Sequence, residues 1–293
     1  MRLHIKRIAL AIAVVALLAL AGPLAWLKAH EAELVFRVTE SHARVNPTLP
    51  PDFERISITA VDGTPLAANI LRAAKDHDTG LWVLHLHGNS ETAFSNIQYE
   101  HVRVLQRLGF SVLGLDYRGF GLTPGTPSEQ AVDQDAASAY DYLKRQGVDD
   151  AHIVLWGHSL GSGPAVYLAV THPAKALVLF GAFTSIPEAA ADTYPYLPVR
   201  NIASVQFNSR ARLKDVRVPV LIAHSRNDNV ILYHHAEELF AAANPPKKLL
   251  ALNPIRDDGL GGHQHALYDQ PTLLAPALGE LLGISITYSA SSD

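Results

Sequence analysis

The chain has 293 residues, of which 48% are hydrophobic and 18% charged, and it contains no cysteine. These values are typical of a globular chain with a large core, and they exclude disulfide bonds, thiolate metal sites and a cysteine nucleophile. The net charge is −4, but the first 28 residues carry four basic side chains and no acidic one, so the rest of the chain is clearly acidic. An acidic body argues against nucleic acid as a partner, since phosphate binding requires a basic surface.

The N-terminal segment, residues 1–30, predicts a membrane anchor. Ile8 to Leu27 carries no charge, and as a helix it would span about 30 Å, the thickness of the hydrocarbon core of a bilayer. Basic residues at positions 2, 6 and 7 favour a cytoplasmic N-terminus and a body on the outer side. The alternative is a signal peptide cleaved after the Ala-Leu-Ala sequence at 19–21. Both interpretations place the remaining chain outside the cytoplasm, either anchored or secreted.

The remaining chain predicts one domain built from alternating strands and helices. Residues 31–52 are polar and contain several prolines, which predicts a linker, and the turn sequence Asp62-Gly63 lies between two strands of a predicted hairpin. The predicted strands are Arg55–Ala60, Leu66–Arg72, Leu81–His87, Phe110–Asp116, His152–Trp156, Ala176–Phe180, Val218–His224 and Lys248–Leu252. The predicted helices are Asn96–Leu108, Ser128–Gln146, Leu160–His172, Tyr233–Ala243 and Ala266–Leu282.

This order of elements predicts an α/β fold with a mostly parallel central sheet flanked by helices and with antiparallel strands at one edge. We expect the domain to cover residues 53–283 and to be followed by a C-terminal tail, 284–293. The connection 181–217 is unusually long for a compact domain and is rich in proline and aromatic residues. Such an insertion favours a short lid over a functional site.

The sequence Gly157-His158-Ser159-Leu160-Gly161 is the strongest chemical signal in the chain. It lies between a predicted strand and a predicted helix, where a sharp turn presents the central side chain above the edge of the sheet. The flanking glycines relieve the steric clashes that such a turn creates. Ser159 is therefore the predicted nucleophile.

A serine hydroxyl needs a base to activate it and an acid to orient that base, and in this arrangement the acid precedes the base in the chain. Asp228 follows the strand Val218–His224, which makes it the predicted acid. His263, directly after Gly261-Gly262, is the predicted base, with His265 as the alternative. Asp257 and Asp258 are alternative acids, but they lie too close to His263 in the sequence to occupy a separate strand end.

Two backbone N–H groups are also required to stabilise the oxyanion of a tetrahedral intermediate. The N–H of Leu160, directly after the nucleophile, is the first predicted donor. The second is expected in the loop after the strand Leu81–His87, where Gly88 permits a close approach and Asn89 supplies the N–H. The alternating pair His85 and His87 could suggest a metal, but the chain continues Gly-Asn-Ser without further ligands, so the sequence predicts neither a metal nor another cofactor.

Together these motifs resemble serine α/β-hydrolases, most closely the membrane-anchored group that includes lysophosphatidylserine and monoacylglycerol lipases. The resemblance covers about residues 53–283 and rests on the segments Leu84–Asn89, Leu115–Gly121, Pro127–Glu129, Gly157–Leu168, Pro219–His224 with Asp228, and Asp257–Tyr268. It implies the same roles for Ser159, Asp228 and His263, and it implies ester substrates with one acyl chain. The chain differs from many of these relatives in having Ser225 where they carry glycine, and its 181–217 insertion matches no substrate-specific pattern.

We therefore expect a serine hydrolase that cleaves carboxylic esters, lipid-like or with one acyl chain, through an acyl-enzyme. A thioesterase acting on acylated proteins and a peptidase or amidase are alternatives, because the same three residues serve all these reactions. An inert binding domain is the alternative outside the enzymes. Enzymes of this fold that cleave epoxides or haloalkanes use an aspartate nucleophile, whereas position 159 is serine.

Overall fold

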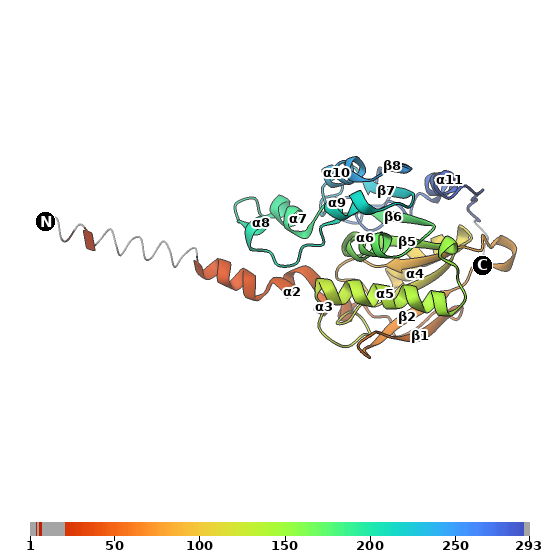
Figure 1. Ribbon diagram of the computed structural model, residues 1–293, viewed down its shortest axis with the longest axis horizontal. Helices are drawn as coiled ribbons and strands as arrows, with labels where there is room; N and C mark the ends of the chain where they lie inside the picture. Colours follow the sequence, from red (N-terminus) through yellow and green to blue (C-terminus); the bar gives the residue numbers. More distant parts are fainter. Residues whose placement is uncertain (1–3, 5, 8–20, 290–293) are drawn as a thin grey trace.

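The structure is a computed structural model that describes residues 4, 6, 7 and 21–289, and its centre is an eight-stranded sheet (Figure 1). The strand order is β1-β2-β4-β3-β5-β6-β7-β8, in which β2 pairs antiparallel with both β1 and β4 and all other neighbours pair parallel. The strands are β1 (Phe53–Thr59), β2 (Pro65–Leu71), β3 (Trp82–Leu86), β4 (Ser111–Leu115), β5 (Ile153–His158), β6 (Ala176–Phe180), β7 (Val220–Ser225) and β8 (Lys247–Leu252). This topology confirms the predicted fold class, including the hairpin at the edge.

Helices cover both faces of the sheet (Figure 1). Those in the main domain are α4 (Asn96–Arg107), α5 (Glu129–Arg145), α6 (Ser162–Thr171), α10 (His234–Ala242) and α11 (Pro271–Leu282). The predicted helix over 266–282 begins later than expected, at Pro271. The reason is local: Gln270 turns its side chain back to the carbonyl of Ala266, and proline is favoured in the first turn of a helix.

The apolar strands divide their side chains between two cores. Leu84 and Leu155 contribute to the core beneath α5 and α6, whereas their neighbours Val83 and Val154 contribute to the core beneath α4 and α11. Successive side chains of a strand point to opposite faces, so a parallel strand that is covered on both sides must be apolar along its whole length. Because β3 to β8 run in the same direction, their carboxyl ends form one common edge of the sheet. The loops at this edge carry the polar residues.

Residues 31–52, which the sequence predicted to be a linker, contain the short helices α2 (Glu31–Phe36) and α3 (Val38–Ala43) and pack against the domain. Phe36 is fully buried and makes edge-to-face contacts with Phe120 and Phe207. Ser41 is buried as well, and its hydroxyl donates to the carbonyl of Glu91. One aromatic anchor and one buried hydroxyl thus fix a segment whose overall composition is polar.

The expected lid, residues 181–217, contains α7 (Ile186–Thr193), α8 (Val199–Ile202) and α9 (Ser209–Arg212), and it lies beside α2 in Figure 1. Glu31 joins the two segments, because its Oε1 accepts hydrogen bonds from the backbone N–H groups of Ser204 and Val205. Lys28 donates to the carbonyl of Ile202 at 2.8 Å. The N-terminal segment and the insertion therefore form one layer above the carboxyl edge of the sheet.

The predicted membrane anchor, Ile8–Leu27, lies mostly outside the described residues. Residues 21–29 are helical and lead into α2. In the part of the chain that the structure describes, every helix is too short or too polar to cross a bilayer.

Candidate active site

Ser159 stands at the turn between β5 and the helical segment that leads into α6. Its φ is +49°, a left-handed conformation that is uncommon for a residue with a side chain and that stores strain at functional turns. The turn is tight enough to need the flanking glycines. A Cβ atom on Gly157 would lie 2.6 Å from the carbonyl oxygen of Gly161, and one on Gly161 would lie 2.1 Å from the carbonyl oxygen of Leu86. The sequence pattern therefore marks the strained strand-to-helix turn that it predicted.

The residues singled out as base and acid meet Ser159 in one hydrogen-bonded chain. His263 Nε2 lies 3.0 Å from Ser159 Oγ, and His263 Nδ1 lies 2.7 Å from Asp228 Oδ2. All three side chains are buried. His265 instead packs edge-on against His101, with ring centroids 5.5 Å apart. Of the two histidines in this loop, His263 is thus the one that the fold turns toward Ser159.

The carboxylate of Asp228 is held as an anion. Burial by itself would raise its pKa, but hydrogen bonds from His224 and His263 outweigh that effect and keep the pKa well below its usual range. The other oxygen, Oδ1, accepts the backbone N–H groups of Val230 and Ile231, both at 2.9 Å. A charged and fully hydrogen-bonded carboxylate at this position orients the His263 ring with Nδ1–H toward Asp228, which leaves Nε2 free to accept the Ser159 proton.

The loop that carries His263 is fixed by its backbone. Gly261 and Gly262 have φ of +67° and +86°, and a Cβ on Gly261 would lie 1.8 Å from the carbonyl oxygen of Asn227. The hydroxyl of Ser225 donates to the Gly261 carbonyl at 2.6 Å and so helps to hold this loop. Asp258, one of the alternative acids, accepts three backbone N–H groups of the same loop. Its role here is to shape the turn.

The two predicted oxyanion donors line the same cavity as Ser159. Leu160 lies in the first turn after Ser159, where backbone N–H groups lack helical partners and the helix dipole favours negative charge. Asn89 lies in the β3–α4 loop, residues 87–95, directly after Gly88. A Cβ on Gly88 would lie 3.3 Å from Ser159 Cβ, which shows how closely this loop approaches Ser159. The positions of Asn89 and Leu160 are compatible with the predicted role.

The cavity above Ser159 has a volume of about 380 Å³ and combines apolar walls with a charged rim. The N-terminal segment contributes two exposed arginines, Arg37 and Arg44, of which Arg37 pairs with Glu40 at 2.9 Å. The insertion contributes part of the apolar wall. The apolar lining residues are Val35, Leu160, Phe183, Ile186, Ala189, Val230, Ile231 and Leu260.

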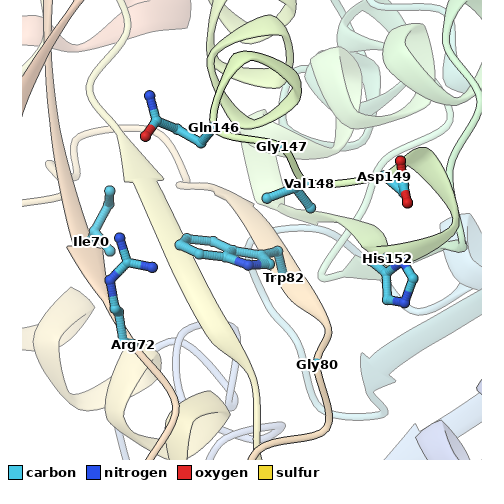
Figure 2. Close-up of a pocket in the computed structure, with 9 residues that line it drawn as sticks. All are labelled: Ile70, Arg72, Gly80, Trp82, Gln146, Gly147, Val148, Asp149 and His152. Atoms are coloured by element: carbon cyan, nitrogen blue, oxygen red, sulfur yellow. The ribbon is translucent and has the colours of Figure 1, made fainter.

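A second pocket, of about 370 Å³, lies at the opposite edge of the sheet (Figure 2). Trp82 opens β3 and His152 immediately precedes β5, so this pocket is at the amino-terminal ends of the strands, whereas Ser159 follows a carboxyl end. In Figure 2 the guanidinium of Arg72 stands beside the Trp82 ring, 5.2 Å from its centroid. None of the residues that the sequence singled out for catalysis lines this pocket.

Among the described residues, one group of side chains brings metal-ligating atoms within 4.8 Å of one another, namely Asp192, His234 and His235. Asp192 Oδ2 lies 2.7 Å from His234 Nε2 and 2.9 Å from His235 Nε2, which is an arrangement of hydrogen bonds between α7 and α10. His85 and His87 separate, contrary to the alternation expected for one strand. His85 contacts the Tyr268 hydroxyl, whereas His87 lies beyond the end of β3.

Three further residues of the site were not singled out from the sequence. His224 lies 3.2 Å from Asp228, and Glu91 and His158 face each other beneath the β3–α4 loop. Only His158, inside the serine motif, could have been found from its position. Glu91 and His224 belong to segments whose spatial neighbours are distant in the sequence.

Comparison with known proteins supports the fold. A family model described as the alpha/beta hydrolase fold matches residues 82–201. An uncharacterized protein of Mycobacterium tuberculosis (strain H37Rv) is 38% identical over 187 residues, which is 64% of this chain and 65% of that protein. The lysophosphatidylserine lipase ABHD12 of Rattus norvegicus is 33% identical over 225 residues, which is 69% of this chain and 56% of the lipase. The similarity thus spans somewhat more than half the length of these relatives.

Solved structures show the same architecture. The esterase Pf2001 of Pyrococcus furiosus superimposes with a TM-score of 0.65 at 16% identity, over 82% of this chain and 96% of the esterase. Est1E of Butyrivibrio proteoclasticus, solved with ferulic acid bound, gives a TM-score of 0.64 at 19% identity, over 78% of this chain and 99% of Est1E. At these identities the likeness establishes the fold alone.

Proposed function

Because this chain has the α/β-hydrolase fold, we propose that it is a serine hydrolase that cleaves carboxylic esters with one acyl chain through an acyl-enzyme. The observation that carries the proposal is the chain of contacts from Ser159 through His263 to Asp228, at 3.0 and 2.7 Å. A serine at a strained strand-to-helix turn, with a base and an anionic acid in line, is the arrangement that activates a hydroxyl.

The geometry supports the following reaction. Ser159 Oγ attacks the ester carbonyl while His263 Nε2 accepts the hydroxyl proton, and the N–H groups of Leu160 and Asn89 bind the oxyanion. His263 then returns the proton to the leaving alcohol, which leaves Ser159 acylated. A water molecule then attacks the acyl carbon while His263 accepts a proton from it. His263 returns this proton to Ser159 Oγ, and the acyl group leaves as a carboxylic acid. Asp228 stays ionised throughout and stabilises the imidazolium.

The substrate class is supported by the cavity and by the named relatives. Apolar walls from Val35, Phe183 and Ile186 suit an acyl chain, and the volume of about 380 Å³ is at the small end of ligand pockets. The relatives named lysophosphatidylserine lipases act, by that name, on a lipid with one acyl chain. We therefore propose lipid-like monoacyl esters as substrates, and we expect short and medium chains to be cleaved fastest.

Labelling with a fluorophosphonate probe tests the proposed nucleophile. We expect the full chain to be labelled covalently and the Ser159→Ala variant to be unlabelled, because phosphonylation requires an activated serine. Ser57→Ala is the matched control, since Ser57 is exposed on the edge strand β1 and should leave labelling unchanged. A folded wild-type chain that hydrolyses no ester and takes up no probe would refute the proposal.

Matched substrates distinguish the ester reaction from the alternatives. The same acyl group should be presented as an ester, a thioester and a peptide-like amide, and kcat/KM should be measured for each. We expect the ester to be cleaved faster than the amide by at least one order of magnitude. A preference for the thioester on acylated peptides would favour the alternative of a protein thioesterase.

We further propose that residues 8–27 tether the enzyme to a membrane with the catalytic domain outside the cytoplasm. The support is the uncharged run and the basic residues before it. Extraction of membranes with carbonate should leave the full chain in the pellet, and external protease should cleave it in intact cells or spheroplasts. Release of the chain by carbonate, or its appearance in the medium, would favour a cleaved signal peptide instead.

A further inference from the structure

Glu91 is a carboxylate buried beneath the β3–α4 loop, next to the nucleophile. Only 2% of the residue is exposed, and its Oε2 accepts the backbone N–H of Gly88 at 3.2 Å and the side-chain amide of Gln98. Gln264, which follows His263, approaches the other oxygen at 3.5 Å. A buried carboxylate with donors only from neutral groups would be costly, so its surroundings should supply a positive charge.

His158 is positioned to supply that charge. Its Nε2 lies 3.0 Å from the carbonyl oxygen of His263 and must therefore donate a proton to it. Its Nδ1 lies 3.6 Å from Glu91 Oε2. In the neutral ring with Nε2 protonated, the Nδ1 lone pair would face the carboxylate, whereas the imidazolium presents an N–H there. The two contacts together favour the charged ring.

Several other titratable groups surround His158. They are His87 in the β3–α4 loop, His85 on β3, His101 on α4, and His263 and Asp228 of the site. Burial lowers the pKa of His85 to about 3 and that of His101 well below its usual value, so both rings are neutral. Burial also opposes the charge on His158, but the attraction of Glu91 outweighs it and raises the pKa of His158.

We propose that Glu91 and His158 form a buried carboxylate–imidazolium pair that positions the Gly88–Asn89 backbone and His263 for the reaction at Ser159. One member of the pair holds the N–H of Gly88, and the other holds the carbonyl of His263. The pair thus connects the loop that carries the predicted oxyanion donor Asn89 to the loop that carries the base. Both are positioning residues, because neither touches the reacting atoms.

The charge of the pair matters as well as its hydrogen bonds. The reaction develops negative charge on the oxyanion, close to Gly88 and Leu160, and an uncompensated carboxylate at Glu91 would oppose it. The imidazolium of His158 cancels that effect. When His158 loses its proton at alkaline pH, the negative charge of Glu91 is no longer balanced, and the reaction slows. The inference rests on the proposed serine hydrolase activity and predicts an alkaline limb in its pH profile.

Three variants separate charge from shape. Glu91→Gln keeps an oxygen for Gly88, His158→Gln keeps an amide for the His263 carbonyl, and the double variant removes both charges together. We expect His158→Gln to lower kcat about 100-fold with little change in KM, because it leaves Glu91 as an unpaired buried charge. The double variant should recover at least tenfold of that loss and should lack the alkaline limb. Glu100→Gln, at an exposed position of α4, is the control and should behave as wild type.

A double variant that is no faster than His158→Gln, or that keeps the alkaline limb, would overturn the proposal, because purely structural damage accumulates. A second measurement needs no activity. In ¹⁵N-histidine-labelled Ser159→Ala protein, the His158 ring, assigned by its absence from the spectrum of Ser159→Ala/His158→Gln, should show both nitrogens protonated at pH 7.5. A neutral ring at that pH would overturn the proposal even if a variant failed to fold.

The two measurements also keep this inference distinct from the proposed function. A wild-type chain without hydrolase activity would refute the function, while the charge state of His158 would still be decided by the spectrum. An active wild type with a neutral His158 would refute the pair and leave the function intact.

Discussion

His224 Nε2 lies 3.2 Å from Asp228 Oδ2, the same oxygen that His263 Nδ1 approaches at 2.7 Å. The strand-end histidine is completely buried and also donates to the carbonyl of Ile231 at 2.8 Å. Two histidines thus share one carboxylate oxygen, and His224 helps to keep Asp228 ionised.

Replacing Asp228 by Asn should affect both catalysis and acid stability. We expect kcat to fall by about 10⁴-fold, because an amide can hold the His263 ring in the wrong tautomer. Asp228 has a pKa lowered by folding, so its stabilising contribution is present above the unfolded-state pKa of about 3.9 and is lost as the pH falls toward the folded-state value. The difference in melting temperature between wild type and variant should therefore narrow as the pH is lowered from 7 to 3. A constant difference would contradict this assignment.

The contribution of Asp133 to stability should have the opposite dependence on pH. Burial raises its pKa to about 7 against the attraction of Arg212, and its Oδ1 is buried without a hydrogen-bond partner among the described residues. A carboxyl that keeps its proton in the folded state destabilises the protein progressively as the pH rises from about 4 to 7. At pH 8 the free energy of unfolding of Asp133→Asn should therefore exceed that of wild type by on the order of 2 kcal/mol. At pH 4 the two proteins should be equally stable. Asp141→Asn, exposed on the same helix, is the control.

Gly161→Ala should damage the turn that presents Ser159. The added Cβ would lie 2.1 Å from the carbonyl oxygen of Leu86, which belongs to β3 and cannot move without disturbing the sheet. We expect the free energy of unfolding to fall by about 1–3 kcal/mol and probe labelling to be lost. Denaturant titration measures the first effect. Gly22→Ala, where nothing lies within 4 Å, should change neither property.

Arg44 predicts a charge preference at the mouth of the cavity. Its exposed guanidinium lines the same cavity as Ser159, whereas Arg37 is already paired with Glu40. If the ester carries a negative group, Arg44→Gln should lower kcat/KM for that substrate about three- to tenfold, since the interaction is solvent-exposed. For a neutral ester of equal chain length the change should be negligible, and the difference should shrink at high salt. An equal loss on both substrates would indicate altered packing instead of charge recognition.

Much of the site could be predicted from the sequence because its signals are local. The glycine spacing around Ser159 reports a strained turn, and the strand–helix alternation places Asp228 and the His263 loop at the same edge of the sheet. The choice of His263 over His265 was suggested by Gly261 and Gly262, whose positive φ angles turn the loop as expected. The polar composition of residues 31–52 predicted a linker. The segment packs on the domain instead, because one buried aromatic residue, Phe36, anchors it.

The sequence by itself determined the fold class and the candidate residues Ser159, Asp228 and His263, since periodicity and turn chemistry depend on neighbours in the chain. Only the tertiary structure decided which residues surround them. The pairing of Glu91 with His158, the second contact of Asp228 with His224, and the wall built by Val35 and the insertion join different elements. Such contacts depend on how separate elements pack, and no local pattern records that.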